Sequence, residues 1–150
     1  MDETILTYIE KVGCYLILYR NKKENDLNEG KWLGIGGHIE SGETRDMAMI
    51  REVKEETNLD VLSYKYRGKV LFTADDYQEI MYLFTVDSFK GEIGDCNEGT
   101  LQFVPKTDIF SLNMWEGDKY FLEPLANDED EFEMELTYKN DKLVSYRRIK

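Results

Sequence analysis

Hydrophobic and polar residues alternate over several short segments of this chain, the pattern expected of β-strands with one buried face. These segments are rich in β-branched, aromatic and aliphatic residues and are separated by turn-forming residues. We expect strands at residues 4–9, 14–19, 62–73, 77–89, 101–104, 131–138 and 143–149, and a short glycine-rich strand at residues 32–39. The first two strands should form a hairpin, with turns at Asp75-Asp76 and Asn140-Asp141 and a polar, charged loop at residues 21–30.

Helical spacing is confined to two places, so the pattern predicts far more strand than helix. Thr44 is a suitable N-cap for a helix over residues 44–57, and Asn58 can adopt the left-handed conformation that ends one. Residues 114–122 have a partly helical pattern. No internal repeat or Pro/Ser-rich linker divides the sequence, so residues 1–150 should form a single α/β (α+β) domain.

Three glutamates of the first expected helix fall on one arc of a helical wheel. With about 100° per residue, Glu52, Glu55 and Glu56 lie within about 100° of one another. Ile50 and Val53 lie roughly opposite, so we expect them to pack on a sheet while the glutamates face a cleft. Repulsion between the carboxylates costs about 0.2–0.5 kcal/mol per pair, which a divalent cation would offset. Carboxylate oxygens favour Mg²⁺ or Mn²⁺ over zinc, and an acidic, solvent-facing stripe is the alternative interpretation.

The overall charge restricts what such a protein can bind. Its 150 residues carry a formal net charge of −12, which should repel polymeric nucleic acid. A small phosphorylated metabolite remains compatible, because a divalent metal reverses the local charge. No apolar run approaches the roughly 18 residues that span a bilayer, and the acidic start at residues 1–4 is unlike a signal peptide. Two distant cysteines, Cys14 and Cys96, fit a reducing compartment, so we expect a cytoplasmic protein without a membrane partner.

One stretch has a spacing specific enough to indicate a family. Gly37 is followed after five residues by Glu43 and after seven more by Arg51-Glu52-Val53, and then come Glu55-Glu56 and Asn58-Leu59. The stretch resembles the Nudix box, Gly-x5-Glu-x7-Arg-Glu-aliphatic-x-Glu-Glu-x-Gly-aliphatic, at eight of its nine defined positions. The departure is Asn58 in place of glycine, and asparagine also suits a left-handed helix end. The resemblance implies a Nudix fold, a mixed β-sheet between helices with a C-terminal β-hairpin.

The same resemblance implies roles for the carboxylates of the box. Nudix enzymes hydrolyse a nucleoside diphosphate linked to another group, using a metal-activated water that attacks phosphorus. Glu52 and Glu56 correspond to main metal ligands, and Glu55 to a further ligand or a holder of metal-bound water. A carbonyl of Gly36 or Gly37 would add an oxygen, and both glycines would lie against the substrate. The expected cofactor is Mg²⁺, with Mn²⁺ as an alternative, and the expected partner is a small nucleotide.

Four further residues acquire roles from this resemblance. Arg51 and Glu43 match family residues that pair and brace the loop against the helix. Glu98 follows the long strands, where relatives carry a glutamate that approaches the metals. It is a candidate general base or auxiliary ligand, and a solvent-exposed loop glutamate is the alternative. His38, the only histidine of the chain, stands where many relatives have lysine, and it would contact phosphate or serve the structure.

Outside the box, the chain resembles the MutT-like branch of the family, whose members cleave oxidised purine nucleoside triphosphates. Residues 30–37 resemble that branch's approach to the box, and residues 114–121 resemble its base-recognition segment. The resemblance implies that Trp115 stacks on a purine and that Asp118 hydrogen-bonds the purine edge. A buried tryptophan with a capping aspartate is the structural alternative.

Two departures in the expected base site bear on substrate choice. Leu33 stands where relatives that recognise 8-oxoguanine have asparagine, and Gly117 stands where they have aspartate. A lost polar contact can cost about 1–3 kcal/mol, so base preference should be shifted or relaxed. We expect hydrolysis of a nucleoside triphosphate such as 8-oxo-dGTP to a monophosphate and pyrophosphate. The alternatives are a Nudix hydrolase of ADP-ribose, a dinucleoside polyphosphate or a nucleotide sugar, and a non-catalytic nucleotide-binding regulator. Monomer and homodimer both fit the sequence.

Overall fold

The computed structural model describes residues 1–22 and 26–150, so the expected loop at residues 21–30 lies partly outside the described residues. The elements along the chain are β1 (Asp2–Lys11), β2 (Cys14–Tyr19), β3 (Trp32–Leu33), β4 (Ile35–His38), α1 (Arg45–Thr57), β5 (Asp60–Ala74), β6 (Tyr77–Lys90), β7 (Thr100–Pro105), a 3₁₀ helix η1 (Ile109–Ser111), α2 (Asp118–Ala126), β8 (Phe132–Lys139) and β9 (Lys142–Arg148).

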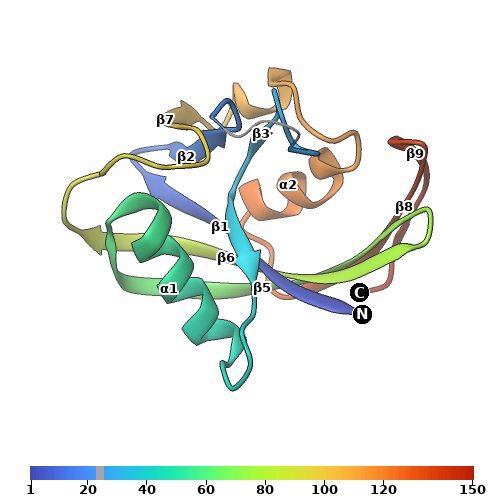
Figure 1. Cartoon of the computed structure of the whole chain (residues 1–150), viewed down its shortest axis with the longest axis horizontal. Helices are drawn as coiled ribbons and strands as arrows, with labels where there is room; N and C mark the ends of the chain where they lie inside the picture. The colour runs from blue at the N-terminus through green and yellow to red at the C-terminus, as the bar shows by residue number, and fades with distance from the viewer. Residues whose placement is uncertain (23–25) are drawn as a thin grey trace.

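The strands of the described residues form one mixed sheet (Figure 1). Its main path has the order β3-β2-β1-β6-β5-β8-β9, while β4 pairs with β1 and β7 pairs with β2. The hairpins β1–β2, β5–β6 and β8–β9 are antiparallel, whereas β1 runs parallel to β6 and β5 runs parallel to β8. The central strand β1 holds β4, the start of the Nudix-like box, through the pairs Leu6–Gly36 and Ile5–Gly37.

Both faces of the sheet are covered by helices. Alternate residues of β2 belong to different core clusters, with Tyr15 and Ile17 in one and Leu16 and Leu18 in the other. The first cluster contains the buried residues of α2, and the second contains those of α1. The two helices accordingly lie on opposite sides of the sheet (Figure 1), which confirms the expected α+β fold with its C-terminal hairpin.

Helix α1 begins and ends where the sequence predicts. The Thr44 hydroxyl accepts a hydrogen bond from the Met47 N–H at 3.1 Å, which is the bond of a helix N-cap. Asn58 has a φ of 68°, and its N–H donates to the Lys54 carbonyl at 3.0 Å. Asparagine therefore makes the left-handed helix end that the family makes with glycine.

The face of α1 that meets the sheet differs from the expected one. The expected packing of Ile50 on the sheet is wrong, because its side chain is 42% exposed, while Met49 and Val53 are fully buried. Glu56 is buried as well, with 8% exposure. The helix contacts β4 as well as β1 and β5, so the main chain of β4 lies beside the glutamates. As a result, the residues of α1 that pack on the sheet and the glutamates of α1 lie on the same side of the helix.

The segment expected to be partly helical, residues 114–122, is helical in part. Its helix begins at Asp118 and continues beyond the expected end to Ala126. A 3₁₀ turn at residues 109–111, which no pattern predicted, precedes it. Among the described residues, no helix is both long and apolar enough to cross a membrane.

Candidate active site

The box begins with a strand whose main chain touches a glutamate of α1. A Cβ atom placed on Gly37 would lie 2.4 Å from the Glu52 Oε1 atom, closer than any real contact. Gly37 therefore leaves room for the Glu52 carboxylate to lie directly against the main chain of β4. This contact explains why the box needs a glycine fifteen residues before the second of its glutamates.

Arg51 donates hydrogen bonds to several groups of the box. Its guanidinium donates to both oxygens of Glu43, at 2.7 and 3.0 Å, and to the His38 carbonyl at 3.0 Å. It also donates to Glu52 at 2.8 Å and to Glu55 at 3.2 Å. The hydrogen bonds from Arg51 hold the pKa of Glu43 below its usual value, and those same bonds raise the pKa of Arg51. The planar guanidinium thus ties the loop after β4 to the carboxylate face of α1.

Glu56 is the most strongly perturbed carboxyl group of the site. Burial raises its pKa to about 10, and a hydrogen bond from protonated Glu56 to Glu98 and the charge of Glu98 act in the same direction. Burial also raises the pKa of Glu52, against the lowering effect of Arg51. Within the described part of the chain, the Glu56 Oε2 atom is buried and has no hydrogen-bond partner. The raised pKa favours the neutral acid form of Glu56.

The oxygen atoms of these carboxyl groups suit a hard divalent cation, although the side chains as placed do not surround a metal ion. Among the described residues, no three His, Cys, Asp or Glu side chains stand together closely enough to enclose a metal. Arg51 occupies one oxygen of Glu52 and one of Glu55, whereas Glu56 keeps a buried oxygen unpartnered. A buried, orphaned carboxylate oxygen among other carboxylates is the donor chemistry that Mg²⁺ and Mn²⁺ prefer.

The Glu98 side chain lies with the glutamates of α1, whereas the His38 side chain lies outside this carboxylate cluster. The Glu98 carboxylate is 33% exposed, acts on Glu56, and lies 3.5 Å from Arg20 Nη1. The His38 imidazole is 68% exposed and lies 3.5 Å from Asp2, on β1. Only the main-chain carbonyl of His38 joins the Arg51 network.

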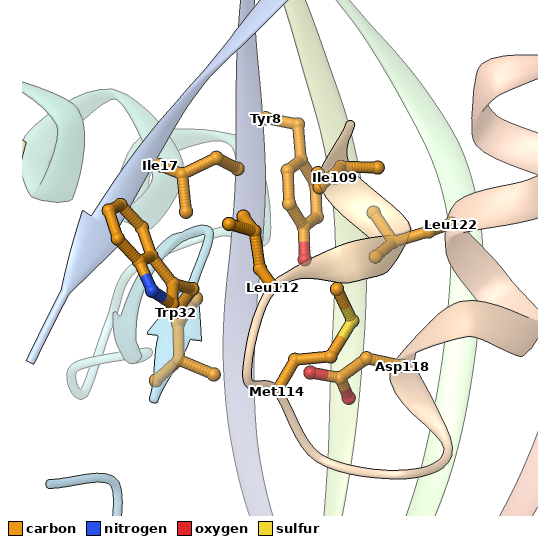
Figure 2. A pocket seen from close by; sticks show the side chains of 9 residues that line it. Tyr8, Ile17, Trp32, Ile109, Leu112, Met114, Asp118 and Leu122 are labelled. Carbon is orange, nitrogen blue, oxygen red and sulfur yellow. The ribbon is translucent and has the colours of Figure 1, made fainter. Parts of the chain in front are cut away.

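A pocket lies on the other face of the sheet, between β1, β2, β3 and the segment that leads into α2 (Figure 2). About 190 Å³ of space not filled by atoms lies among its lining side chains, and this space includes open solvent. Its lining is mostly apolar, with a phenol and a carboxyl group as polar members, and consists of Tyr8, Ile17, Trp32, Leu33, Ile109, Leu112, Met114, Asp118 and Leu122. Leu33 and Asp118, two of the residues expected to contact the base, both line this pocket.

Asp118 supplies the carboxyl group of this pocket. It is the first residue of α2 and is 8% exposed, and burial raises its pKa to about 7, against a lowering effect of Lys31. Burial raises the pKa of Tyr8, and the charge of Asp118 adds to this rise. Figure 2 shows the Tyr8 hydroxyl pointing from β1 toward the side of the pocket where Met114 and Asp118 lie. Near neutral pH, Asp118 can therefore either donate or accept a hydrogen bond.

Trp115 lies beside the pocket but is not part of its lining. It is 8% exposed, and its indole N–H donates to the Asn28 side-chain oxygen at 2.7 Å. Its ring meets the rings of Phe72 and Tyr138 edge to face. The Lys31 ammonium lies 4.9 Å from the ring centre. Trp115 has the contacts of a buried structural tryptophan, and its stacking on a base stays a prediction.

Trp32 and Tyr8 are among the lining residues that were not expected to bind substrate. Trp32 stands next to Leu33 in a glycine-rich approach to the box, and this position was the one available signal for it. Tyr8 had none, because in the sequence it is one more aromatic residue of an alternating strand. The departure at Gly117 has a steric reason: a Cβ there would lie 2.7 Å from the Tyr138 hydroxyl, which accepts a hydrogen bond from the Gly117 N–H.

A mixed sheet between two helices, with a glutamate-bearing helix set against a glycine strand, is the architecture of a Nudix-type pyrophosphohydrolase. The NUDIX domain family matches residues 8–125 of this chain. The chain belongs to the Nudix family and is a pyrophosphohydrolase that acts on nucleoside diphosphate derivatives.

Relatives and solved structures agree with this membership. The chain is 30% identical to a Bacillus subtilis (strain 168) protein described as "Uncharacterized Nudix hydrolase YvcI", over 95% of this chain and 96% of that protein. It is 32% identical to a Danio rerio "Oxidized purine nucleoside triphosphate hydrolase", over 64% of this chain and 63% of that protein. The MutT protein of Bacillus halodurans has a TM-score of 0.89 at 22% identity, covering 99% of this chain and 97% of its own, and shares the fold.

Proposed function

We propose that this enzyme hydrolyses a purine nucleoside triphosphate, with 8-oxo-dGTP as the leading candidate, to a monophosphate and pyrophosphate with Mg²⁺ as cofactor. The observation that carries the proposal is the buried carboxyl group of Asp118 in a mostly apolar pocket. From Leu33 in the pocket to Gly37 beside Glu52 the chain advances four residues, at most about 14 Å at ~3.4 Å per residue. A nucleoside triphosphate can cover that span.

At the phosphate end, the carboxylates would hold the metal. Glu52 and Glu56 are the proposed main ligands, Glu55 and Glu98 are auxiliary, and a carbonyl of Gly36 or Gly37 adds an oxygen. The unpartnered Glu56 Oε2 atom supports this assignment. When bound, Mg²⁺ supplies neutralisation of phosphate charge and lowers the pKa of water.

The remaining residues of the box position the metal-binding groups and do not take part in the reaction itself. Arg51 and Glu43 keep the strand–loop–helix unit rigid through their paired hydrogen bonds. Glu98 is the candidate to accept a proton from water, because it is the most solvent-accessible carboxylate that acts directly on Glu56. Phosphoryl transfer needs mainly such positioning and charge compensation.

At the base end, Asp118 and the apolar lining would select a purine. A carboxyl group with a pKa of about 7 can donate its proton to a carbonyl of the base or accept from an amino group. Leu33 contributes no polar contact, and Tyr138 fills the space that a side chain at position 117 would need. We therefore expect weaker discrimination between oxidised and normal purines than a site with both polar residues would give.

The relatives support this choice of substrate, because the Danio rerio protein is described as acting on oxidized purine nucleoside triphosphates. A non-catalytic role is disfavoured by the presence of Glu52, Glu55 and Glu56 together. The other Nudix substrates remain outcomes of the test below.

A panel of nucleotides tests the proposal. 8-Oxo-dGTP, dGTP, dATP, ADP-ribose, a dinucleoside tetraphosphate and a nucleotide sugar are each incubated with the enzyme and Mg²⁺, and products are resolved chromatographically. We expect triphosphates to give monophosphate and pyrophosphate, with 8-oxo-dGTP fastest. Rapid turnover of ADP-ribose, with 8-oxo-dGTP cleaved no faster than dGTP, would contradict the proposal.

A further inference from the structure

Arg20, at the end of β2, connects two acidic residues from different loops. Its Nε atom donates to Asp26 Oδ2 at 2.8 Å, and its Nη1 atom lies 3.5 Å from Glu98 Oε2. The Arg20 side chain is 14% exposed and that of Asp26 is 9% exposed. This ion pair is therefore largely shielded from water, unlike most arginine–carboxylate pairs at a surface.

Asp26 holds Arg20 in a fixed direction. While Oδ2 accepts from Arg20, Oδ1 accepts from the Asn28 N–H at 3.2 Å. Main-chain hydrogen bonds close the same turn: the Gly30 N–H donates to the Arg20 carbonyl at 2.8 Å, and the Arg20 N–H donates to the Lys31 carbonyl at 3.0 Å. Because hydrogen bonds hold both the main chain and the Nε atom of Arg20, the guanidinium directs Nη1 toward Glu98 in one orientation.

The loop that carries Glu98 is fastened by other residues. The Lys22 ammonium donates to the Cys96 carbonyl at 3.1 Å, and the Asn21 side-chain amide donates to the Thr100 hydroxyl at 3.1 Å. These bonds hold the main chain on either side of Glu98. Unlike these two bonds, the contact from Arg20 reaches the Glu98 carboxylate itself.

We propose that Arg20 and Asp26 are positioning residues that fix the Glu98 carboxylate beside Glu56. The inference rests on the proposed function, in which Glu98 serves the metal end of the site. Groups that orient a ligand residue typically change metal affinity by about 10–100-fold when they are removed. The same aspartate reaches Asn28, which accepts from the Trp115 indole, so the positioning pair is continuous with the bracing of the base side.

The direction in which one substitution changes the affinity for a cation distinguishes a positioning role from a purely electrostatic one. Removing a positive charge beside a cluster of carboxylates would by itself tighten binding of a cation. Losing the orientation of Glu98 would weaken that binding. Arg20→Met thus has opposite expected signs under the two roles.

Mn²⁺ binding to the metal-free protein, measured by electron paramagnetic resonance without nucleotide, tests the inference. We expect Arg20→Met and Asp26→Asn each to raise the Mn²⁺ dissociation constant about 10-fold. A lysine keeps the charge but cannot contact both acids, so Arg20→Lys should stay within about threefold of Arg20→Met. In a Glu98→Gln background, Arg20→Met should have no further effect, because Arg20 acts through Glu98.

One control variant matches these changes. Arg148→Met breaks an Arg–Glu pair of 2.6 Å far from the site. It should leave the Mn²⁺ dissociation constant unchanged. Thermal unfolding shows whether each variant is folded. If Arg20→Met does not fold, the Mn²⁺ dissociation constants of Arg20→Lys and Asp26→Asn test the inference.

Unchanged or tighter Mn²⁺ binding in the folded Arg20 and Asp26 variants would overturn the inference, as would a full-sized loss in the Glu98→Gln background. With nucleotide, kcat should fall while KM stays within about twofold, since positioning acts on the metal end. If the wild-type protein turns over none of the panel, the proposed function fails, while the Mn²⁺ titrations still decide the role of Arg20.

Discussion

The two ends of the proposed nucleotide site are built from the chain in different ways. The glutamate end comes from one continuous stretch, residues 36–56, with Glu98 added from a loop. The base pocket is assembled from β1, β2, β3, the 109–114 segment and α2. The first is therefore held together by contacts local in sequence, such as those of Arg51, and the second by the packing of the whole domain.

This difference has a consequence for how each end tolerates change. A substitution in the box disturbs a small network of charged groups that act on one another directly. A substitution in the pocket changes a surface to which many segments contribute, so substrate preference can shift while the chemistry is retained. The departures at Leu33 and Gly117, beside a box that matches its pattern at eight of nine positions, are consistent with this division.

The largest effect should come from the glutamate end. Glu56→Gln removes the proposed ligand whose Oε2 atom is buried and unpartnered, and it should lower kcat by about 10³-fold or more, or ~4 kcal/mol. Steady-state turnover of the best substrate at saturating Mg²⁺ measures it. Glu55→Gln is the matched control, because its carboxylate is 57% exposed, and its loss should be much smaller. Equal losses in the two variants would show that burial does not distinguish these glutamates.

The second effect concerns the base end and stability rather than turnover. Burial raises the pKa of Asp118 from its ordinary value of 3.8 to about 7, so over this range the folded state retains a proton that the unfolded chain has lost. Stability should therefore fall as pH rises from about 4 to about 7 and then level off, by at most about 4 kcal/mol. Asp118→Asn removes this term, so the variant should gain stability relative to wild type between pH 4 and pH 8. Urea unfolding with EDTA at several pH values measures the difference, and a constant difference across this range would refute the assignment.

The smallest effect tests whether the two ends are separable. Leu33→Asn introduces an amide into the pocket and should raise the preference for 8-oxo-dGTP over dGTP about 10-fold in kcat/KM, or ~1.4 kcal/mol. The kcat on the better substrate should stay near that of wild type. Leu112→Asn places the same amide on another element of the pocket, and it should impair both substrates alike. A large loss of kcat in Leu33→Asn would show that the pocket and the metal end are not independent.

The same division explains what the sequence could predict. Spacing located α1, its caps at Thr44 and Asn58, and the glutamates, because these depend on residues a few positions apart. It misplaced Ile50, since a helical wheel does not show that β4 approaches the glutamate side of the helix. It also missed Tyr8 and the Arg20–Asp26 pair, whose partners lie far away along the chain and meet only when the sheet forms.

The raised pKa of Glu56 has a consequence for how the site takes up its metal. A neutral acid at this position spares an already acidic protein from holding several adjacent negative charges in a partly buried cleft. Loading of the cofactor must then expel that proton, so it is an exchange of one cation for another. Calorimetry of metal loading in buffers of different ionisation enthalpy should register about one proton released per site, and occupancy should decline in acid even at constant total metal.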